Sequence, residues 1–264
     1  TISKIKRGTR RRKAPAPFIT STLQQDASRR LGFTAKRTMA IAQQLYEGIG
    51  GSGLITYMRT DSTNIAKSAV EEARSFISER FGEEYLPKSA PKHKTRAKGA
   101  QEAHEAVRPT SAMRTPKSIQ SDLNSSQYKL YNLIWQRFIA SQMSSAVYDT
   151  LKVDITGETK ENEYLLRASG SAINFAGFLA VYGDKRNLNK KKSENGDENT
   201  DIPAGLEEGQ IQELIRLIPK QHFTQPPPRF SEASLVQILE ENAIGRPSTY
   251  APTLSTIQAR GYVE

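Results

Sequence analysis

A short stretch of the chain, residues 53–62 (GLITYMRTDS), places a tyrosine, an arginine and an aspartate directly after an apolar run. Arg59 lies two residues after Tyr57, and Asp61 lies four residues after it. A phenolic oxygen attacks phosphorus effectively when a cation neutralises the phosphate and positions it in line. Side chains two residues apart share one face of an extended chain, so Tyr57 and Arg59 would act together. This arrangement suits cleavage of a nucleic-acid backbone. Most tyrosines are packing or surface residues, however, and spacing alone leaves that alternative open.

The charge balance favours a polyanionic partner. The 264 residues include 38 Lys and Arg against 28 Asp and Glu, a formal net charge of +10. Such an excess is typical of proteins that bind a phosphate backbone, although a protein that is merely basic is the alternative. The absence of cysteine excludes disulfides and thiolate metal sites, and the histidines at 93, 104 and 222 are too scattered for a zinc site. No apolar run approaches the roughly 20 residues of a membrane span and no signal peptide is visible, so we expect a cytoplasmic protein without a membrane partner.

Helices are expected on both sides of the Tyr57 segment. Residues 20–31 and 34–46 each follow a Ser or Thr cap candidate and end near a glycine. The second has an apolar stripe at helical spacing, formed by Met39, Ala42, Leu45 and Tyr46. A glycine-rich joint, residues 48–53, leads into the Tyr57 segment. Ser62 or Thr63 would cap the next helix, and Asp61 would sit at its N-terminus, where an anion is stabilised by the helix dipole.

The rest of the chain up to residue 218 contains both helical and strand-like patterns. The remaining elements expected from the sequence are a basic arm over 4–13 (with a solvated strand as the alternative), a basic loop over 87–98, a short helix over 101–107, a long amphipathic helix over 125–143, strands over 147–155, 164–182 and 211–218, and a disordered loop over 186–201.

The end of the chain has the outline of a winged helix-turn-helix. Ser231 would cap one helix, a glycine-bearing turn over 243–247 follows, and Ser248 would cap a second helix. Arg246, Ser248 and Thr249 at this helix start are suited to binding phosphate. An ordinary helical hairpin is the alternative.

Four motifs, in order over most of the chain, resemble bacterial type IA DNA topoisomerases, the topoisomerase I family. They are PFITSTLQQ at 17–25, LITYMRTDS at 54–62, QEAHEAVRP at 101–109, and PRFSEASLV at 228–236 with GRPSTY at 245–250. The resemblance implies an ATP-independent isomerase whose partners are single-stranded and negatively supercoiled DNA. It also implies a monomer. Strand cleavage through a 5′-phosphotyrosine, strand passage and religation would relax negative supercoils.

The resemblance also assigns roles to single residues. Tyr57 would be the nucleophile, Arg59 would hold the scissile phosphate, and His104 would contact that phosphate or orient Asp61, completing the catalytic set. The DNA-binding set would be Arg108, Arg229, Arg246, Ser248 and Thr249. Arg108 has a structural alternative, which is pairing with Glu105.

The fold implied by the resemblance is α+β and multidomain. A helical, winged-helix-like catalytic domain (residues 18–144) would be inserted in a β-rich arch domain. That arch would begin at 1–17 and continue at 145–220. Residues 221–264 would form part of a second winged-helix-like DNA-binding domain.

One feature departs from the family pattern. The family places a metal-binding acidic domain with a D-x-D type cluster ahead of this region, whereas this sequence contains no Asp-x-Asp. We therefore expect an N-terminally incomplete chain with no metal site, in which Mg²⁺ is bound mainly by residues outside it. Such a chain would not relax supercoils alone.

Three rival functions stay open. A tyrosine recombinase or nicking relaxase also uses phosphotyrosine chemistry, and recombinases leave the tyrosine on a 3′-phosphate. In a non-catalytic winged-helix DNA-binding protein, Tyr57 would be incidental. A topoisomerase III-like decatenase would share the same catalytic residues.

Overall fold

The computed structural model describes residues 1–48, 51–93, 104–183 and 205–263. Its internal contacts divide the chain into two compact units. The sheet unit comprises Thr1–Lys13 and Ser145–Pro227, and the helical unit comprises Ala14–Ser144 and Pro228–Glu264. In chain order, the first part of the helical unit is therefore inserted between two parts of the sheet unit. Because the chain combines helices and a sheet in this way, the expected α+β class is confirmed.

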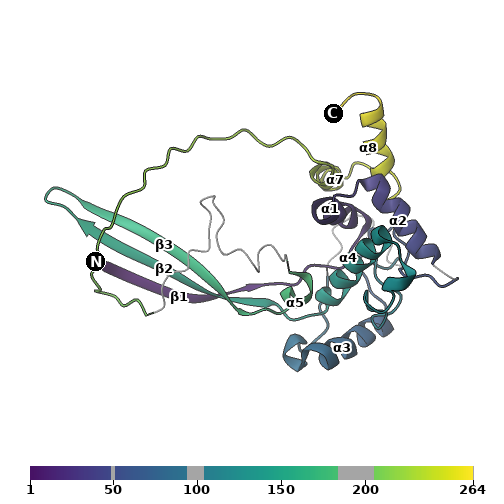
Figure 1. Ribbon diagram of the computed structural model, residues 1–264, viewed down its shortest axis with the longest axis horizontal. Helices are drawn as coiled ribbons and strands as arrows, with labels where there is room; N and C mark the ends of the chain where they lie inside the picture. The colour runs from purple at the N-terminus through teal and green to yellow at the C-terminus, as the bar shows by residue number, and fades with distance from the viewer. Residues whose placement is uncertain (49–50, 94–103, 184–204, 264) are drawn as a thin grey trace. The chain divides into compact units, whose positions relative to one another are not determined.

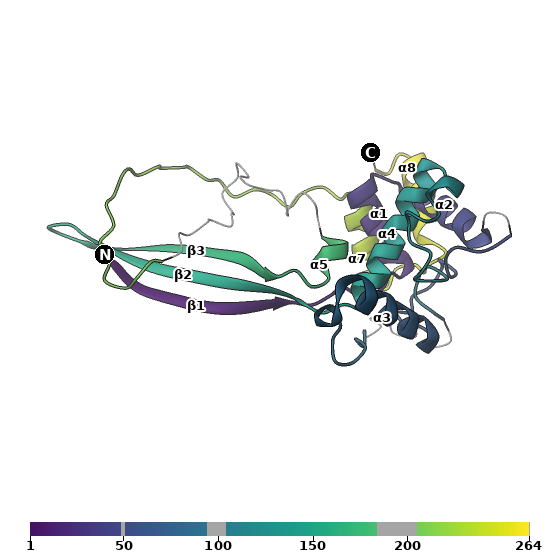
Figure 2. The same ribbon diagram turned by 60° about the horizontal axis from the view of Figure 1, so that its bottom comes forward.

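The sheet unit is built on three long antiparallel strands in the order β1-β2-β3 (Figures 1 and 2). The strands are β1 (Ile2–Arg12), β2 (Ala146–Glu158) and β3 (Glu163–Phe175). Paired residues share a face, so Lys6 opposes Lys152 on one face while Ile5 opposes Val153 on the other. Val153 is buried. The expected basic arm at the start of the chain is thus a strand, the alternative reading, because β2 supplies hydrogen-bonding partners that composition does not reveal.

Two predicted strands and two predicted loops differ in how the structure bears on them. The strand predicted over 164–182 ends at Phe175, and a short helix, α5 (Leu179–Tyr182), follows Gly177, whose positive φ of 50° turns the chain. The strand predicted over 211–218 is wrong, since this stretch has no regular secondary structure and its side chains are exposed. The loop predicted over 186–201 lies outside the described residues, as do residues 94–98 of the basic loop.

The helical unit contains six α-helices among its described residues: α1 (Thr20–Leu31), α2 (Ala35–Glu47), α3 (Lys67–Phe81), α4 (Ser125–Ser141), α7 (Glu232–Glu241) and α8 (Tyr250–Ala259). Two 3₁₀ turns, η1 (Glu83–Tyr85) and η2 (Gln120–Asp122), complete its regular elements. The predicted helices around α1, α2 and α4 are confirmed, and Gly32 ends α1 in the left-handed conformation that favours glycine. Residues 104–107 are not helical, and 101–103 lie outside the described residues.

The core of the helical unit forms where α1, α2 and α4 meet the chain around the Tyr57 segment. Its fully buried members include Phe18, Leu23, Leu45, Ile55, Leu130, Ile134 and Phe138. Burial of a side chain of this size contributes about 1.5–3 kcal/mol. Ile55 belongs to the segment that bears Tyr57, so hydrophobic packing fixes the backbone two residues before the tyrosine.

Helix caps agree with the sequence at some ends and differ at others. Thr34 and Ser231 cap α2 and α7 through their side chains, as expected. In contrast, α3 begins at Lys67, beyond the predicted caps Ser62 and Thr63, and so Asp61 is not at its N-terminus. Helix α8 begins at Tyr250 rather than after a Ser248 cap. The Thr249 hydroxyl bonds backbone atoms of Arg246 within the preceding turn.

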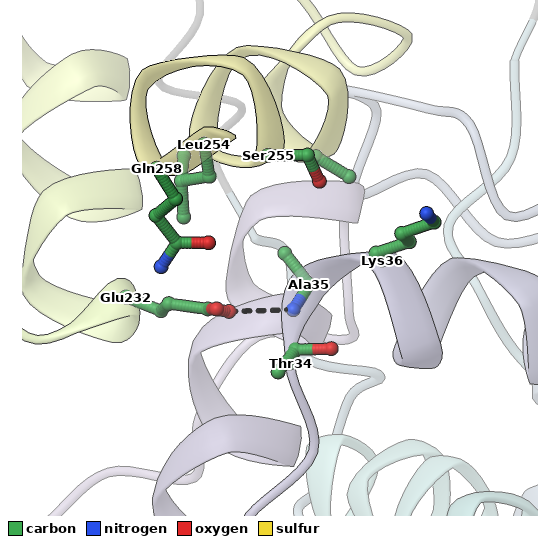
Figure 3. Close-up of a pocket in the computed structure, with 8 residues that line it drawn as sticks. Thr34, Ala35, Lys36, Glu232, Leu254, Ser255 and Gln258 are labelled. Carbon is green, nitrogen blue, oxygen red and sulfur yellow. Dashed lines mark hydrogen bonds between the residues drawn. The ribbon is translucent and has the colours of Figure 1, made fainter. Parts of the chain in front are cut away.

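Helices α7 and α8 pack on α1 and α2 rather than forming a unit of their own. A small buried cluster joins them: Ala35, Val236, Tyr250, Ala251 and Leu254. The Glu232 carboxylate accepts a hydrogen bond of 2.7 Å from the Ala35 backbone N–H, beside a cavity of about 220 Å³ (Figure 3). This bond satisfies one of the free donors at the start of α2. The predicted boundaries of the three domains, at 17/18, 144/145 and 220/221, stay a prediction.

No helix among the described residues is both long and apolar enough to cross a membrane.

The half-buried His93 predicts a pH dependence of folding. Burial lowers the pKa of His93, Arg137 lowers it further, and a hydrogen bond to the Ser141 carbonyl opposes both. A lowered pKa means that the unfolded state binds the proton more readily, so stability is fully present above the unfolded value of about 6.5 and declines as the pH falls below it.

We expect the free energy of unfolding, measured by urea denaturation, to fall between about pH 7.5 and pH 5.5. His93→Gln should flatten this dependence, and His222→Gln, at an exposed position, should not. An unchanged slope in His93→Gln would contradict the assignment.

Candidate active site

The segment that bears Tyr57 alternates between exposed and buried side chains. Tyr57 is 46% exposed and Arg59 is also exposed, whereas Met58 and Thr60 are buried at 1% and 3%. Tyr57 and Arg59 therefore share the outer face of an extended segment, the geometry that their spacing predicts. Within the described residues, the Tyr57 hydroxyl makes no hydrogen bond. The phenol is thus accessible to a ligand, and the nearest charged residue along the same face is a cation.

The Thr20 side chain fixes the inner face of this segment. Its hydroxyl donates to the Met58 carbonyl at 2.7 Å and accepts from the Thr60 N–H at 2.8 Å, while the Thr20 N–H donates to the Thr60 carbonyl at 2.9 Å. Thr20 is fully buried. It is the first residue of α1, so these bonds join the start of that helix to the backbone on both sides of Arg59. Buried hydrogen bonds of this kind are costly to leave unmade.

A second strand-like segment, residues 106–110, supports the other side. The Thr56 N–H donates to the Arg108 carbonyl, and the Thr56 hydroxyl donates to the Ala106 carbonyl at 2.7 Å. Isolated β-bridges join Ile55 to Pro109 and Phe18 to Val107. These bonds hold the residue immediately before Tyr57. The tyrosine is therefore carried by a backbone that is anchored on both sides, although no regular strand forms.

Arg108 is used inside the fold. Only 11% of its side chain is exposed, and its Nη2 lies 2.8 Å from the Glu105 carboxylate, with a further bond from Nη1 to the Pro109 carbonyl. Glu105 in turn accepts from the Ala66 N–H, one residue before α3. The structural alternative, pairing with Glu105, is what the structure contains. A DNA contact by Arg108 stays a prediction, and it would require the guanidinium to leave these buried partners.

Tyr46, near the end of α2, lies against Tyr57. The two ring centroids are 5.2 Å apart with an interplanar angle of 65°, an edge-to-face contact. Tyr46 is 41% exposed, so the apolar-stripe assignment from the sequence is wrong for this residue. Ala42 and Leu45 are the fully buried members of the stripe. Sequence reasoning missed this contact, and its only signal was a tyrosine beside the glycine-rich joint.

The other predicted site residues outside the Tyr57 segment, apart from Arg108, are exposed. His104 is exposed, and no hydrogen bond or ion pair joins it to Asp61 within the part of the chain that the structure describes. Its phosphate contact stays a prediction. Arg229 is exposed ahead of α7, and Arg246 and Ser248 are exposed in the turn before α8. Thr249 is also exposed, but its hydroxyl already bonds Arg246.

The start of α8 lies within electrostatic reach of Asp61. Burial raises the pKa of Tyr250, Glu240 and Asp61 raise it further, and Arg246 lowers it. These groups come from α7, the turn before α8 and the Tyr57 segment. Exposed Arg246 and exposed Tyr57 therefore belong to the same compact unit, although nearly 190 residues separate them in the sequence.

The described residues do not suit a divalent metal. They contain no group of three or more His, Cys, Asp or Glu side chains that could hold an ion. Hard cations such as Mg²⁺ are held by carboxylate oxygens together with substrate phosphates, and Asp61 is the only carboxylate of the predicted catalytic set. We therefore assign no metal-binding role to these residues.

Comparison with known proteins identifies the family. A family model described as DNA topoisomerase matches residues 1–264, and the chain belongs to that family. DNA topoisomerase 1 of Xylella fastidiosa strain Temecula1 is 47% identical over 268 residues, which is 100% of this chain and 32% of that protein. The protein of strain 9a5c gives the same values. These matches confirm the family resemblance that the four sequence motifs indicate.

A solved structure of a topoisomerase I is also similar to this chain. Full-length topoisomerase I from Thermotoga maritima, in a monoclinic crystal form, matches with a TM-score of 0.79 and 39% identity. The match covers 100% of this chain and 41% of that one. The chain thus spans 32% of the length of the curated relatives.

Removing the Thr20 hydroxyl should loosen the Tyr57 segment. We expect Thr20→Val, which keeps the side-chain shape, to lower the free energy of unfolding by about 1–3 kcal/mol, because two backbone groups lose a buried partner. Urea denaturation measures the loss. Thr253→Val, at an exposed position of α8, is the control. Equal stability of the two variants would show that Thr20 does not anchor the segment.

Arg108 offers a test between a structural and a DNA-binding role. Arg108→Met should lower the free energy of unfolding by about 1–3 kcal/mol, since Glu105 keeps its charge without its partner. DNA affinity of the folded variant, measured by fluorescence anisotropy at fixed salt, should change less than about twofold. A stable variant that binds DNA weakly would restore the DNA-binding role.

Proposed function

We propose that this chain carries the nucleophile and part of the DNA-binding surface of a type IA DNA topoisomerase. The observation that carries the proposal is the exposed Tyr57 phenol beside exposed Arg59 on a doubly anchored backbone. An accessible hydroxyl provides the attacking atom, and the guanidinium provides charge for the phosphate. Rigid anchoring fixes the backbone positions from which both side chains extend, which favours an in-line approach.

The reaction exchanges one phosphate ester for another. The Tyr57 oxygen forms a bond to phosphorus as the bond between phosphorus and the 3′-oxygen breaks. The phenolic proton is lost and the leaving 3′-oxygen takes up a proton, giving a 5′-phosphotyrosine and a free 3′-hydroxyl. Religation reverses these steps. Because the ester bond is conserved, the cycle needs no ATP, and relief of negative supercoiling gives it direction.

Arg59 would stabilise the charge that develops on the phosphate oxygens. A planar guanidinium can offer two parallel hydrogen bonds to phosphate, which a lysine cannot. Its exposure and its lack of an ion pair among the described residues support this role. His104, also exposed, would contact the same phosphate. Mg²⁺, which the family implies, would be held by other residues than these, and no step above passes through it.

The turn before α8 would bind the DNA strand. Arg246 and Ser248 are exposed there, and Arg229 is exposed ahead of α7. Thr249 would contribute through the shape of the turn, since its hydroxyl closes that turn. The chain's net charge of +10 supports a polyanionic partner, and we propose single-stranded and negatively supercoiled DNA as that partner, bound by a monomer.

Substituting the nucleophile tests the proposal. In the full-length protein, Tyr57→Phe should abolish covalent attachment to a single-stranded oligonucleotide trapped with denaturant. DNA affinity should stay within about twofold, because the ring and its surroundings are kept. Tyr164→Phe, an exposed tyrosine of β3, is the control and should cleave normally.

Mapping the attached end decides between the enzyme classes. A 5′-phosphate on the protein supports the topoisomerase reaction, whereas a 3′-phosphate indicates a recombinase. Undiminished cleavage by Tyr57→Phe would leave a protein that binds DNA without using Tyr57 in catalysis.

A further inference from the structure

Tyr46 is not a core residue of the helical unit, although its ring is in contact with Tyr57. It is 41% exposed, and within the described residues its hydroxyl makes no hydrogen bond. The ring packs edge-to-face against Tyr57, with ring centroids 5.2 Å apart and an interplanar angle of 65°. Two exposed aromatic rings in this geometry restrict one another while leaving one side of each open to solvent. A ligand could therefore reach the open side of the Tyr57 ring while Tyr46 remains packed against it.

The backbone brings the end of α2 to this position. The Leu54 N–H donates to the Leu45 carbonyl at 2.8 Å, which joins the last turn of α2 to the start of the Tyr57 segment. A Cβ at Gly53 would lie 2.7 Å from the Tyr46 carbonyl oxygen, and one at Gly48 would lie 2.1 Å from the Ser52 carbonyl oxygen. Both approaches require glycine. At Gly48 and Gly53 the glycine-rich joint is therefore closely packed, next to the bond that joins the end of α2 to the Tyr57 segment.

An exposed tyrosine would otherwise sample several rotamers. The ring turns about two side-chain torsions, and an exposed ring without neighbours pays entropy when it adopts one orientation. An aromatic neighbour that packs edge-to-face favours a subset of these orientations before any ligand arrives. In-line attack accepts only a narrow range of directions for the phenolic oxygen, so restriction in advance raises the rate of the chemical step.

We propose that Tyr46 is a positioning residue for Tyr57, holding its ring in the orientation from which the phenolic oxygen attacks. This role rests on the proposed function of Tyr57. It requires the Tyr46 ring and not its hydroxyl. Phenylalanine at position 46 should therefore retain the role, and leucine, which is apolar but has no aromatic ring, should lose it.

The kinetic test compares Tyr46→Phe and Tyr46→Leu in the full-length protein. Single-turnover cleavage of a labelled single-stranded oligonucleotide is measured across DNA concentrations, which separates the maximal cleavage rate from the apparent DNA affinity. We expect Tyr46→Leu to lower the maximal rate by about three- to tenfold, the range that an aromatic pair supports. Its affinity, and both parameters of Tyr46→Phe, should stay within about twofold. Tyr164→Leu is the matched control at an exposed tyrosine.

Each other outcome overturns the assignment. An unchanged maximal rate in Tyr46→Leu removes the positioning role. A loss confined to affinity assigns Tyr46 to stacking on a base, and equal loss in the phenylalanine variant assigns the effect to the hydroxyl. Tyr57→Phe is assayed alongside. If it still forms the covalent adduct, the proposed function fails, whereas inactivity of Tyr57→Phe with full activity of Tyr46→Leu rejects the positioning role alone.

A spectroscopic measurement tests the ring contact without catalysis. With ring-labelled tyrosine in the full-length protein, the Tyr57 resonance is assigned by its loss in Tyr57→Phe. Tyr46→Leu should shift this resonance, because the neighbouring ring current is removed, and Tyr46→Phe should keep it near its original position. Dispersion of the remaining resonances reports whether each variant folds. A folded leucine variant with an unmoved Tyr57 resonance would refute the contact.

Discussion

The arrangement of the site depends on one buried side chain, the Thr20 hydroxyl. It donates to the Met58 carbonyl and accepts from the Thr60 N–H, so it holds the backbone on both sides of Arg59. An extended segment without a neighbouring strand leaves its polar backbone groups unpaired, which is costly in a buried setting. Thr20 and the 106–110 segment supply those partners. The outer face of the segment, with Tyr57 and Arg59, is thereby left free for a ligand.

Burial separates the arginines of the helical unit into two kinds. Arg108 pairs with Glu105 inside the fold, and this carboxylate also accepts from the N–H of Ala66 before α3. Arg59 and Arg246 are exposed. A guanidinium whose donors are already engaged cannot bind phosphate without breaking its own pair, whereas an exposed one loses only water. Arg108 therefore stabilises the fold, whereas Arg59 and Arg246 are exposed and available to a ligand.

Helices distant in sequence meet around the Tyr57 segment. Glu232 bonds the start of α2, and Tyr250 lies within electrostatic reach of Asp61. The buried apolar cluster formed by α2, α7 and α8 holds these three helices together. A surface that binds DNA from the turn before α8 and cleaves it at Tyr57 would therefore be assembled within one compact unit. This unit belongs to a chain that spans 32% of the length of its curated relatives in the DNA topoisomerase family.

The sequence by itself determined the family, the α+β class, the helices α1, α2 and α4, and the alternation that places Tyr57 and Arg59 on one face. These follow from local periodicity, helix caps and ordered motifs, which depend on neighbours along the chain. Only the tertiary structure decided the strand over 2–12, the late start of α3, the burial of Arg108 and the contact of Tyr46 with Tyr57. Each of these depends on a partner far away in sequence: β2 for the strand, Glu105 for α3 and Arg108, and the close glycine packing at 48 and 53 for Tyr46. Local patterns do not encode such partners, because pairing and burial are properties of the folded chain as a whole.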